Sequence, residues 1–417
     1  MRCSKVNEIG PLALAVRASH IALMAPSDEA EKTGRSVTVD GNRLSFFPGG
    51  PERLEALIAL IDNAQTSVRL LYYIFLPGTV AERIKAALRK AMDRGVKISL
   101  LIDGFGSSAT PEEYFADLVE AGIRFCRFNP SYGRRYLLRN HQKLALADGE
   151  TDRSAVIIGG FNIADDYFPA SLDSGWRDVG LLVEGPAAGR LTAYYDKLMD
   201  WAKSRNSHMR RLRRMIFDHS ESHGRLQWQL GGPTGDLSPW GISTARDLVQ
   251  SCDAEMIVAY FAPPGSFLKR TGRTGRRGRA RLVTAGKSDN TATIAAARFT
   301  YGRLLKRGVE IFEYLPAKLH TKLVVLDDVA HIGSSNVDIR SLYLNMELML
   351  RVEDGAFAQM MRTYFEGELG RCCPITPALH KKRATLLNRI RWAVSFFLVT
   401  SFDYGVTRRL NFNLAGD

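Results

Sequence analysis

The chain of 417 residues is 45% hydrophobic and 24% charged, the proportions of a folded protein that buries one large core or two smaller ones. These proportions exclude an intrinsically disordered chain, a collagen-like chain and a long coiled coil. Against 44 aspartates and glutamates stand 57 lysines and arginines, which leave a formal charge of +13. This charge favours a polyanionic partner, either nucleic acid or an anionic membrane surface.

The amino terminus carries two short apolar stretches, Pro11–Val16 and Ile21–Ala25, which are separated by an arginine and a histidine. Both are too short for the apolar core of a secretory signal or for a helix that spans a membrane. We therefore expect no cleaved signal and assign residues 1–39 to an N-terminal extension.

Two halves of the chain repeat one pattern of strands and helices. Ser67–Pro77 predicts a buried strand, and Ala254–Pro263 repeats its apolar run, tyrosine, phenylalanine and final proline. The predicted helix Thr79–Arg94 and strand Val96–Asp103 follow in the first half, and the predicted strand Arg279–Thr284 follows in the second. Strands that alternate with helices predict an α/β fold, with a mostly parallel sheet and helices on its faces.

The boundary between the halves is expected within residues 203–240, where a strongly basic segment precedes one rich in glycine and proline. This range is interpreted as a linker. The first repeat then occupies residues 40–202 and the second residues 241–370. Residues 371–417 form a basic and apolar C-terminal tail.

A second basic segment, Lys269–Arg281, is rich in arginine and interrupted by glycines. This pattern predicts a mobile loop that opens into a strand. Two interpretations remain open. The segment is either a solvated surface loop or a clamp on the phosphate groups of a lipid surface or a nucleic acid.

His219 and His223 have the spacing of two metal ligands on a helix, but no further ligand pair accompanies them. The five cysteines include no CxxC pair of the kind that binds metals or exchanges disulfides. We therefore interpret the histidine pair as part of a surface loop and expect neither a metal nor a cofactor.

The C-terminal tail contains a nearly unbroken apolar run, Trp392–Phe402. A run of about eleven residues is too short to cross roughly 30 Å of hydrocarbon as a helix. One face of a helix here would carry a set of apolar residues: Leu386, Leu387, Ile390, Val394, Phe397 and Leu398. Cations would lie largely on the other face, which suits a helix in a membrane interface. A helix packed on the protein core is the alternative.

One short motif, H-x-K-x4-D, occurs once in each half. Its copies are His141, Lys143 and Asp148, and His320, Lys322 and Asp327. The four residues before each aspartate are apolar, so each motif enters a buried strand. Alternation along a strand places each histidine and its lysine on one face, and each aspartate at the far end of the strand on the other.

The duplicated motif resembles that of the phospholipase D superfamily, and the resemblance extends over about residues 40–370. The flanks are most similar to the bacterial cardiolipin synthase branch. They are Gly159-Gly-Phe-Asn162, Trp176-Arg-Asp178, Gly333-Ser-Ser-Asn336 and Asn345-Met-Glu347. The resemblance implies two α/β sandwich repeats that form a pseudo-twofold pair with one shared active site. The two membrane spans that open the best known synthases have no counterpart here, so the tail is considered as an anchor.

A phosphodiester repels nucleophiles, so an enzyme without a metal needs fixed cations, an attacking group and an acid for the leaving alkoxide. Lys143 and Lys322 can hold the non-bridging oxygens. The side chains expected to add donors are Asn162, Ser335 and Asn336. One histidine can form a phosphohistidine while the other serves as acid and then base. The family pattern implies that His141 attacks and His320 exchanges protons, although the symmetry of the sequence also permits the reverse.

Each imidazole needs a carboxylate that holds its other nitrogen. The resemblance implies that these carboxylates cross between the halves, which pairs Glu347 with His141 and Asp178 with His320. A structural salt bridge is the alternative for each carboxylate.

We expect a phosphatidyl transferase that makes cardiolipin from two phosphatidylglycerols and releases glycerol. A phospholipase D-type hydrolase is the first alternative, and a nuclease of the same superfamily is the second, with the charge of +13 and the arginine-rich segment Lys269–Arg281 as its phosphate track. The aromatic residues lie mostly in apolar runs and not among the basic stretches, so no base-stacking platform is visible and no nucleic acid is expected as partner. The expected location is peripheral, on the cytoplasmic face of a bacterial inner membrane.

Overall fold

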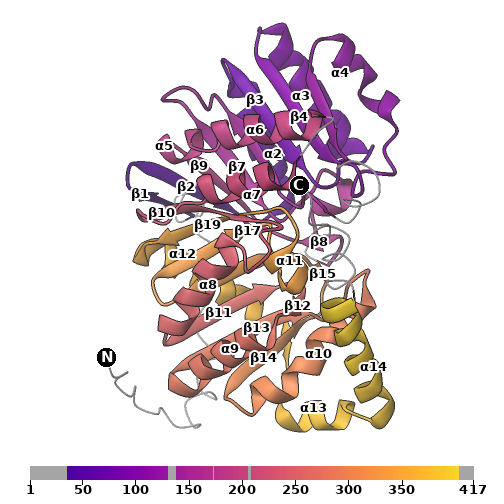
Figure 1. The fold of residues 1–417 in the computed structure, drawn as a ribbon, viewed down its shortest axis with the longest axis vertical. Coiled ribbons are helices and arrows are strands. Elements are labelled where there is room, and N and C mark those ends of the chain that lie inside the picture. Colours follow the sequence, from indigo (N-terminus) through magenta and orange to yellow (C-terminus); the bar gives the residue numbers. More distant parts are fainter. Residues whose placement is uncertain (1–34, 130–137, 172, 205–207, 403–417) are drawn as a thin grey trace, which may run out of the picture.

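The computed structural model describes four stretches of the chain: residues 35–129, 138–171, 173–204 and 208–402. These stretches form two eight-stranded sheets, one from each half of the chain, stacked along the long axis of the molecule (Figure 1). The expectation that no signal is cleaved from the amino terminus concerns residues that lie outside the described part.

The first sheet mixes parallel and antiparallel strands. In spatial order its strands are β1 (Ser36–Val39), β2 (Asn42–Phe47), β9 (Gly180–Glu184), β7 (Ala155–Gly159), β6 (Leu144–Ala147), β3 (Ser67–Tyr72), β4 (Lys97–Asp103) and β5 (Arg124–Phe128). Only the pairs β3–β4 and β4–β5 are parallel. The prediction of a mostly parallel sheet was therefore wrong. A short turn joins β6 to β7, and strands joined by a short turn run antiparallel.

The second sheet repeats this arrangement. In spatial order its strands are β10 (Leu226–Gly231), β19 (Glu347–Glu353), β17 (Val329–Gly333), β16 (Lys322–Leu326), β11 (Asp253–Val258), β13 (Arg279–Ala285), β14 (Val309–Tyr314) and β20 (Cys372–Pro374). Its parallel pairs are β11–β13 and β13–β14, the counterparts of those in the first sheet. The edge strands β10 and β20 come from the ranges interpreted as linker and tail, so both ranges contribute to this sheet.

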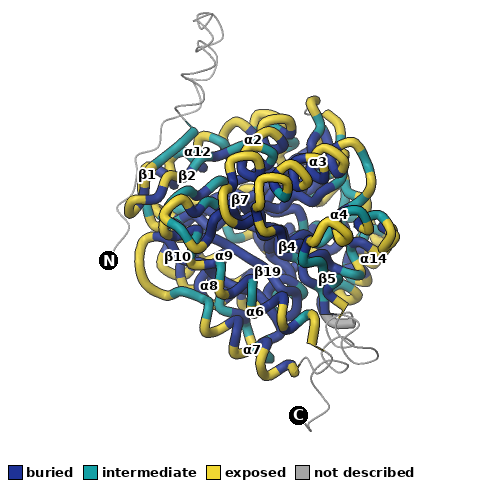
Figure 2. Tube along the Cα trace, turned by 90° about the horizontal axis from the view of Figure 1, so that it is seen from above, coloured by how far each residue is buried: buried dark blue, intermediate teal, exposed yellow. Residues whose placement is uncertain are grey.

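Helices cover both faces of each sheet. On the first sheet, α2 (Gly50–Asn63), α3 (Thr79–Asp93) and α4 (Ala116–Glu120) lie on one face, and α5 (Pro186–Gly189), α6 (Thr192–Lys203) and α7 (Met209–Asp218) on the other. On the second, α8 (Pro239–Gln250), α9 (Gly265–Arg277) and α10 (Thr291–Leu305) lie on one face, and α12 (Gly355–Leu369) on the other. One apolar core contains buried side chains of α6, β10, β16 and α12, so it joins the halves, and the strands at its centre are buried (Figure 2).

The arginine-rich segment forms helix α9, so the prediction of a mobile loop was wrong. Phe267 and Leu268 anchor the helix in the core. Its glycines serve close packing: a Cβ at Gly272 would lie 2.3 Å from Cδ of Arg307, and one at Gly275 would lie 2.9 Å from the Arg307 carbonyl oxygen. Glycine is thus required for contact with the neighbouring turn, not for flexibility.

The tail forms α13 (Pro377–Arg383), α14 (Leu386–Phe397) and a last turn, η3 (Leu398–Phe402). Helix α14 packs against α10 at the rim of the second half (Figure 1). The apolar residues assigned to one face are indeed exposed together, although Trp392 of the same helix is buried. Within the described stretches, no helix has both the length and the apolar character needed to cross a bilayer.

Candidate active site

Two short ladders join the halves where the histidine motifs begin. Asn140 bridges Met346, and the His141 amide donates to the Met346 carbonyl oxygen at 2.9 Å. In the other half, β15 (Lys318–Leu319) pairs with β8 (Trp176–Arg177) in parallel. Each motif is therefore aligned against the segment that immediately precedes a buried carboxylate of the opposite half.

The two histidine–carboxylate pairs cross between the halves, as the family resemblance implied. Nδ1 of His141 lies 3.0 Å from Oε2 of Glu347, and Nδ1 of His320 lies 2.5 Å from Oδ2 of Asp178. Both carboxylates are fully buried. Because an ionised carboxylate only accepts hydrogen bonds, Nδ1 of each ring carries the hydrogen and Nε2 is the basic nitrogen.

Each lysine of the motif is held beside the backbone of its own histidine. Nζ of Lys143 donates to the carbonyl oxygen of His141 at 2.6 Å, and Nζ of Lys322 donates to that of His320. Nζ of Lys143 also lies 5.2 Å from the centre of the Tyr73 ring, within range of a cation–π contact. Both lysines are 1% exposed. The site thus holds two buried ammonium groups at fixed positions.

Burial controls the charge of the histidines. It lowers the pKa of His141 to about 4 and that of His320 to about 3, with nearby lysine charges acting in the same direction and the carboxylates opposing them. Burial also lowers the pKa of Lys322 to about 8 and that of Lys143 well below its ordinary value. Both imidazoles are therefore neutral at pH 7, as a nucleophile requires. An entering phosphodiester adds negative charge, which favours protonation of an imidazole.

The two asparagines of the flanks occupy matching positions. Oδ1 of Asn162 accepts a hydrogen bond from the Ile74 amide at 3.1 Å, and Oδ1 of Asn336 accepts one from the Tyr260 amide at 3.2 Å. Each asparagine therefore fixes the loop after the central strand of its own half. The hydroxyl of Ser335 donates to the Asn336 carbonyl oxygen at 3.2 Å.

Ser334 is a site residue that sequence reasoning missed. Its hydroxyl donates to Oε2 of Glu347 at 2.5 Å, the oxygen that also faces His141. The matching position in the first half is Gly160, where a Cβ would lie 2.7 Å from Oδ2 of Asp178. The sequence could have pointed to Ser334 through this difference, because the flanks of the two motifs are otherwise similar and carry a serine here in one half and a glycine in the other. The surroundings of the two carboxylates thus differ. Glu347 accepts a hydrogen bond from the Ser334 hydroxyl, whereas Asp178 fills the space that a side chain at Gly160 would need.

Arg53 of α2 is a second residue that the motif did not reveal. Its guanidinium is 2% exposed and donates to the carbonyl oxygens of Asp178 at 2.5 Å and Tyr167 at 2.7 Å. The Tyr167 ring in turn lies 5.2 Å from the His320 ring. Although burial opposes it, the interaction with His320, which includes a hydrogen bond, and the charges of Lys322 and Arg53 hold the pKa of Asp178 below its ordinary value.

The motif aspartates lie away from the histidines. Asp148 has a left-handed backbone (φ 50°) at the β6–β7 turn, and its carboxylate accepts from the amides of Gln65, Thr66 and Ser67 at 2.7 to 3.1 Å. Asp327 does the same for the amides that lead into β11. The structure thus brings the histidines and lysines together, whereas each aspartate ties the strand of its motif to the start of the central strand.

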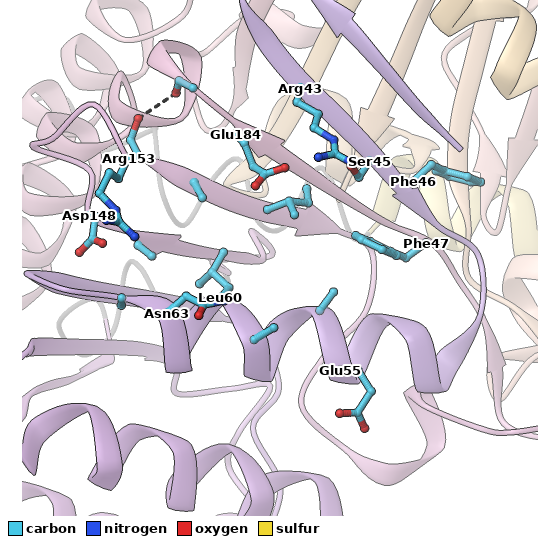
Figure 3. A pocket seen from close by; sticks show the side chains of 18 of the residues that line it. Arg43, Ser45, Phe46, Phe47, Glu55, Leu60, Asn63, Asp148, Arg153 and Glu184 are labelled. Atoms are coloured by element: carbon cyan, nitrogen blue, oxygen red, sulfur yellow. Dashed lines mark hydrogen bonds between the residues drawn. The ribbon is translucent and has the colours of Figure 1, made fainter. Parts of the chain in front are cut away.

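A cavity of about 990 Å³ opens at this far end of the first sheet, between α2 and strands β2 and β9 (Figure 3). Asp148, Arg43 and Glu184 are among its lining residues, together with the apolar side chains Phe46, Phe47 and Leu60. Neither motif histidine and neither motif lysine lines it. This cavity is therefore separate from the histidine site.

Comparison with known sequences agrees with this geometry. A family model described as "Cardiolipin synthase, PLD-like domain" matches residues 57–201 and 246–369. A cardiolipin synthase of Listeria monocytogenes is 29% identical over 374 residues, which cover 87% of this chain and 76% of that protein. Cardiolipin synthase B of Escherichia coli is 27% identical over 373 residues, which cover 87% of this chain and 89% of that protein.

Solved structures share the fold at low sequence identity. The phosphatidylserine synthase of Haemophilus influenzae is similar with a TM-score of 0.66 and 14% identity, over 92% of this chain and 99% of that one. A polyphosphate kinase of Porphyromonas gingivalis is similar with a TM-score of 0.53 and 14% identity, over 81% of this chain and 49% of that one. These similarities support the duplicated α/β architecture.

The placement of Asp148 predicts a loss of stability on its replacement. Asp148→Ala removes the acceptor of the Gln65, Thr66 and Ser67 amides, so the free energy of unfolding should fall by about 2 kcal/mol, measured by urea titration. Because folding lowers the pKa of Asp148, its contribution is complete at neutral pH and disappears as the pH falls below about 4. The control is Asp152→Ala, an exposed residue of the same turn. Equal stability of the two variants at pH 7 would contradict the bracing role.

Proposed function

Because the chain belongs to the cardiolipin synthase family of phospholipase D-like domains, we propose that this enzyme transfers a phosphatidyl group from one phosphatidylglycerol to another and releases glycerol. The observation that carries the proposal is the pair of crossed histidine–carboxylate contacts at one seam. They supply two basic Nε2 atoms beside two buried lysines. This set contains a nucleophile, an acid and charge stabilisation for a phosphodiester.

The first step forms a phosphohistidine. Nε2 of His141 attacks phosphorus of the first phosphatidylglycerol, and the bond from phosphorus to the glycerol oxygen breaks. His320, protonated in the presence of the anionic substrate, donates a proton from Nε2 to that oxygen. Lys143 and Lys322 neutralise the non-bridging oxygens, where negative charge develops. Glu347 holds the imidazole that becomes positively charged on phosphorylation.

The second step returns the enzyme to its starting state. Nε2 of His320, now neutral, removes the proton from a glycerol hydroxyl of the second phosphatidylglycerol. The resulting oxygen nucleophile attacks phosphorus, and the bond to Nε2 of His141 breaks. Cardiolipin leaves, and His320, which ends this step protonated, is the acid again when the next anionic phosphatidylglycerol is bound. A hydrolase would differ only in using water in place of the second lipid.

The substrate class places the proposed enzyme at a lipid surface. We infer a peripheral association with the cytoplasmic face of a bacterial membrane, as for a lipid-modifying protein that has no spanning helix among its described residues. A nuclease is less well supported. Helix α9 connects the carboxyl end of β11, which lies nearest the histidines, to the amino end of the parallel strand β13, so its cations run away from the histidines.

The test is to incubate purified protein with phosphatidylglycerol vesicles and chelator, and to follow cardiolipin, phosphatidic acid and free glycerol. Cardiolipin and glycerol should form in equal amounts. His141→Ala should lower the rate by at least about 10⁴-fold, because it removes the nucleophile. Phosphatidic acid as the main product would favour the hydrolase. Cleavage of single-stranded DNA without any lipid product would favour the nuclease.

The lowered pKa of Lys322, about 8, predicts the alkaline side of the pH profile. The ammonium is present below pH 8 and is lost above it, so kcat/KM for cardiolipin formation should decline with a midpoint near pH 8. Lys322→Arg keeps a positive charge at all these pH values. The variant should be slower, but its decline should move to higher pH. An unchanged midpoint in Lys322→Arg would show that another group titrates.

A further inference from the structure

The outward face of α14 is an unusual apolar surface. Of the thirteen exposed large hydrophobic side chains among the described residues, six lie between Leu386 and Leu398. Leu386 and Leu387 are 75% and 80% exposed, and Ile390 and Phe397 are more than half exposed. Scattered exposed apolar side chains need no explanation, but a contiguous patch of this kind indicates an interaction site.

The opposite side of the same helix is fixed to the protein. Trp392 is buried and stacks on His380 of α13, with ring centres 5.4 Å apart. The Phe396 ring lies 4.8 Å from the ring of Phe299 on α10. The inner contacts therefore hold the helix in place while its apolar outer face points away from the core. The packed helix that the sequence offered as an alternative is thus observed for one face, while the other face is open.

The surroundings of this face are cationic. No acidic residue occurs from residue 369 to residue 402. Arg383 is paired with Glu313, at 3.1 Å. Four other cations of α13 and α14 form no ion pair with any carboxylate in the part of the chain that the structure describes: Lys381, Lys382, Arg389 and Arg391. An apolar face with unpaired cations beside it matches the chemistry of an anionic lipid surface.

The last described turn of the tail contacts a helix near the site residues in the chain. Turn η3 follows α14 and packs against α11 (Ile339–Tyr343). Helix α11 lies between Asn336 and Glu347 in the chain, so it belongs to the loop that carries two site residues. A surface bound to α14 would therefore lie beside the segment that supplies the carboxylate partner of His141.

We propose that the outward face of α14, together with the cations of α13, is the surface by which the protein docks on an anionic bilayer and presents its active site to lipid. The inference rests on the proposed function for the identity of the lipid. A second copy of the chain is a poorer occupant, because two such faces would bring like charges together. The apolar run is too short to span the bilayer, so the helix lies in the interface.

The test compares full-length variants in sedimentation with vesicles of phosphatidylglycerol or of phosphatidylcholine. Ile390→Glu and Phe397→Glu should each weaken binding to phosphatidylglycerol vesicles at least tenfold. The matched controls are Ile242→Glu on α8 and Phe217→Glu on α7, whose side chains are each 52% exposed in the wild type. These controls should bind like the wild type. Added salt should weaken wild-type binding to phosphatidylglycerol, because surface cations contribute to it.

Catalysis is measured in parallel on a short-chain phosphatidylglycerol dissolved as monomers. The two α14 variants should retain the wild-type rate on this substrate and lose activity only on vesicles. If Ile390→Glu and Phe397→Glu bound vesicles as well as the controls do, the docking proposal would be overturned. It would also be overturned if these two variants changed the oligomeric state of the protein without changing its binding to vesicles. If the wild type bound phosphatidylglycerol vesicles but formed no cardiolipin, the proposed function would be wrong, whereas the docking surface would still be supported.

Discussion

The site depends on two hydrogen bonds that cross between the halves, from His141 to Glu347 and from His320 to Asp178. Neither histidine finds its carboxylate in its own half, so the site exists only when the two sheets are docked. The apolar core shared by both halves supplies that docking. The carboxylates need donors of their own because they are fully buried, and Ser334 and the Val179 amide provide them.

Burial of six ionisable groups gives the site its reactivity. Taking imidazoles out of water favours their neutral form more strongly than the neighbouring carboxylates favour the charged form. The site therefore holds two neutral imidazoles beside Lys143 and Lys322, whose own charged forms are made less stable by burial. The negative charge of a bound phosphodiester stabilises the charged forms of both lysines and of one protonated histidine. Substrate binding and the acid–base step are thus linked by the same charges.

The sequence predicted what depends on local pattern. Strand alternation placed each histidine with its lysine and sent Asp148 to the far end of the strand. Spacing could not reveal which carboxylate approaches which ring, and only the family resemblance implied the crossing. Ser334 and Arg53 escaped because their roles arise from contacts between distant segments. The arginine-rich segment was misread because glycine is common to loops and to tightly packed helices, and only the neighbouring Arg307 distinguishes the two.

The most direct test of the crossed site is the tautomeric state of the two imidazoles, measured by ¹⁵N NMR of the full-length protein with labelled histidine. Spectra of His141→Ala and His320→Ala assign the two rings. We predict that in the wild type at pH 7 both are neutral, with the hydrogen on Nδ1 and a bare Nε2, and that Glu347→Gln changes the signals of His141 alone. A hydrogen on Nε2 of either ring, or a response of His320 and not His141 to Glu347→Gln, would contradict the account.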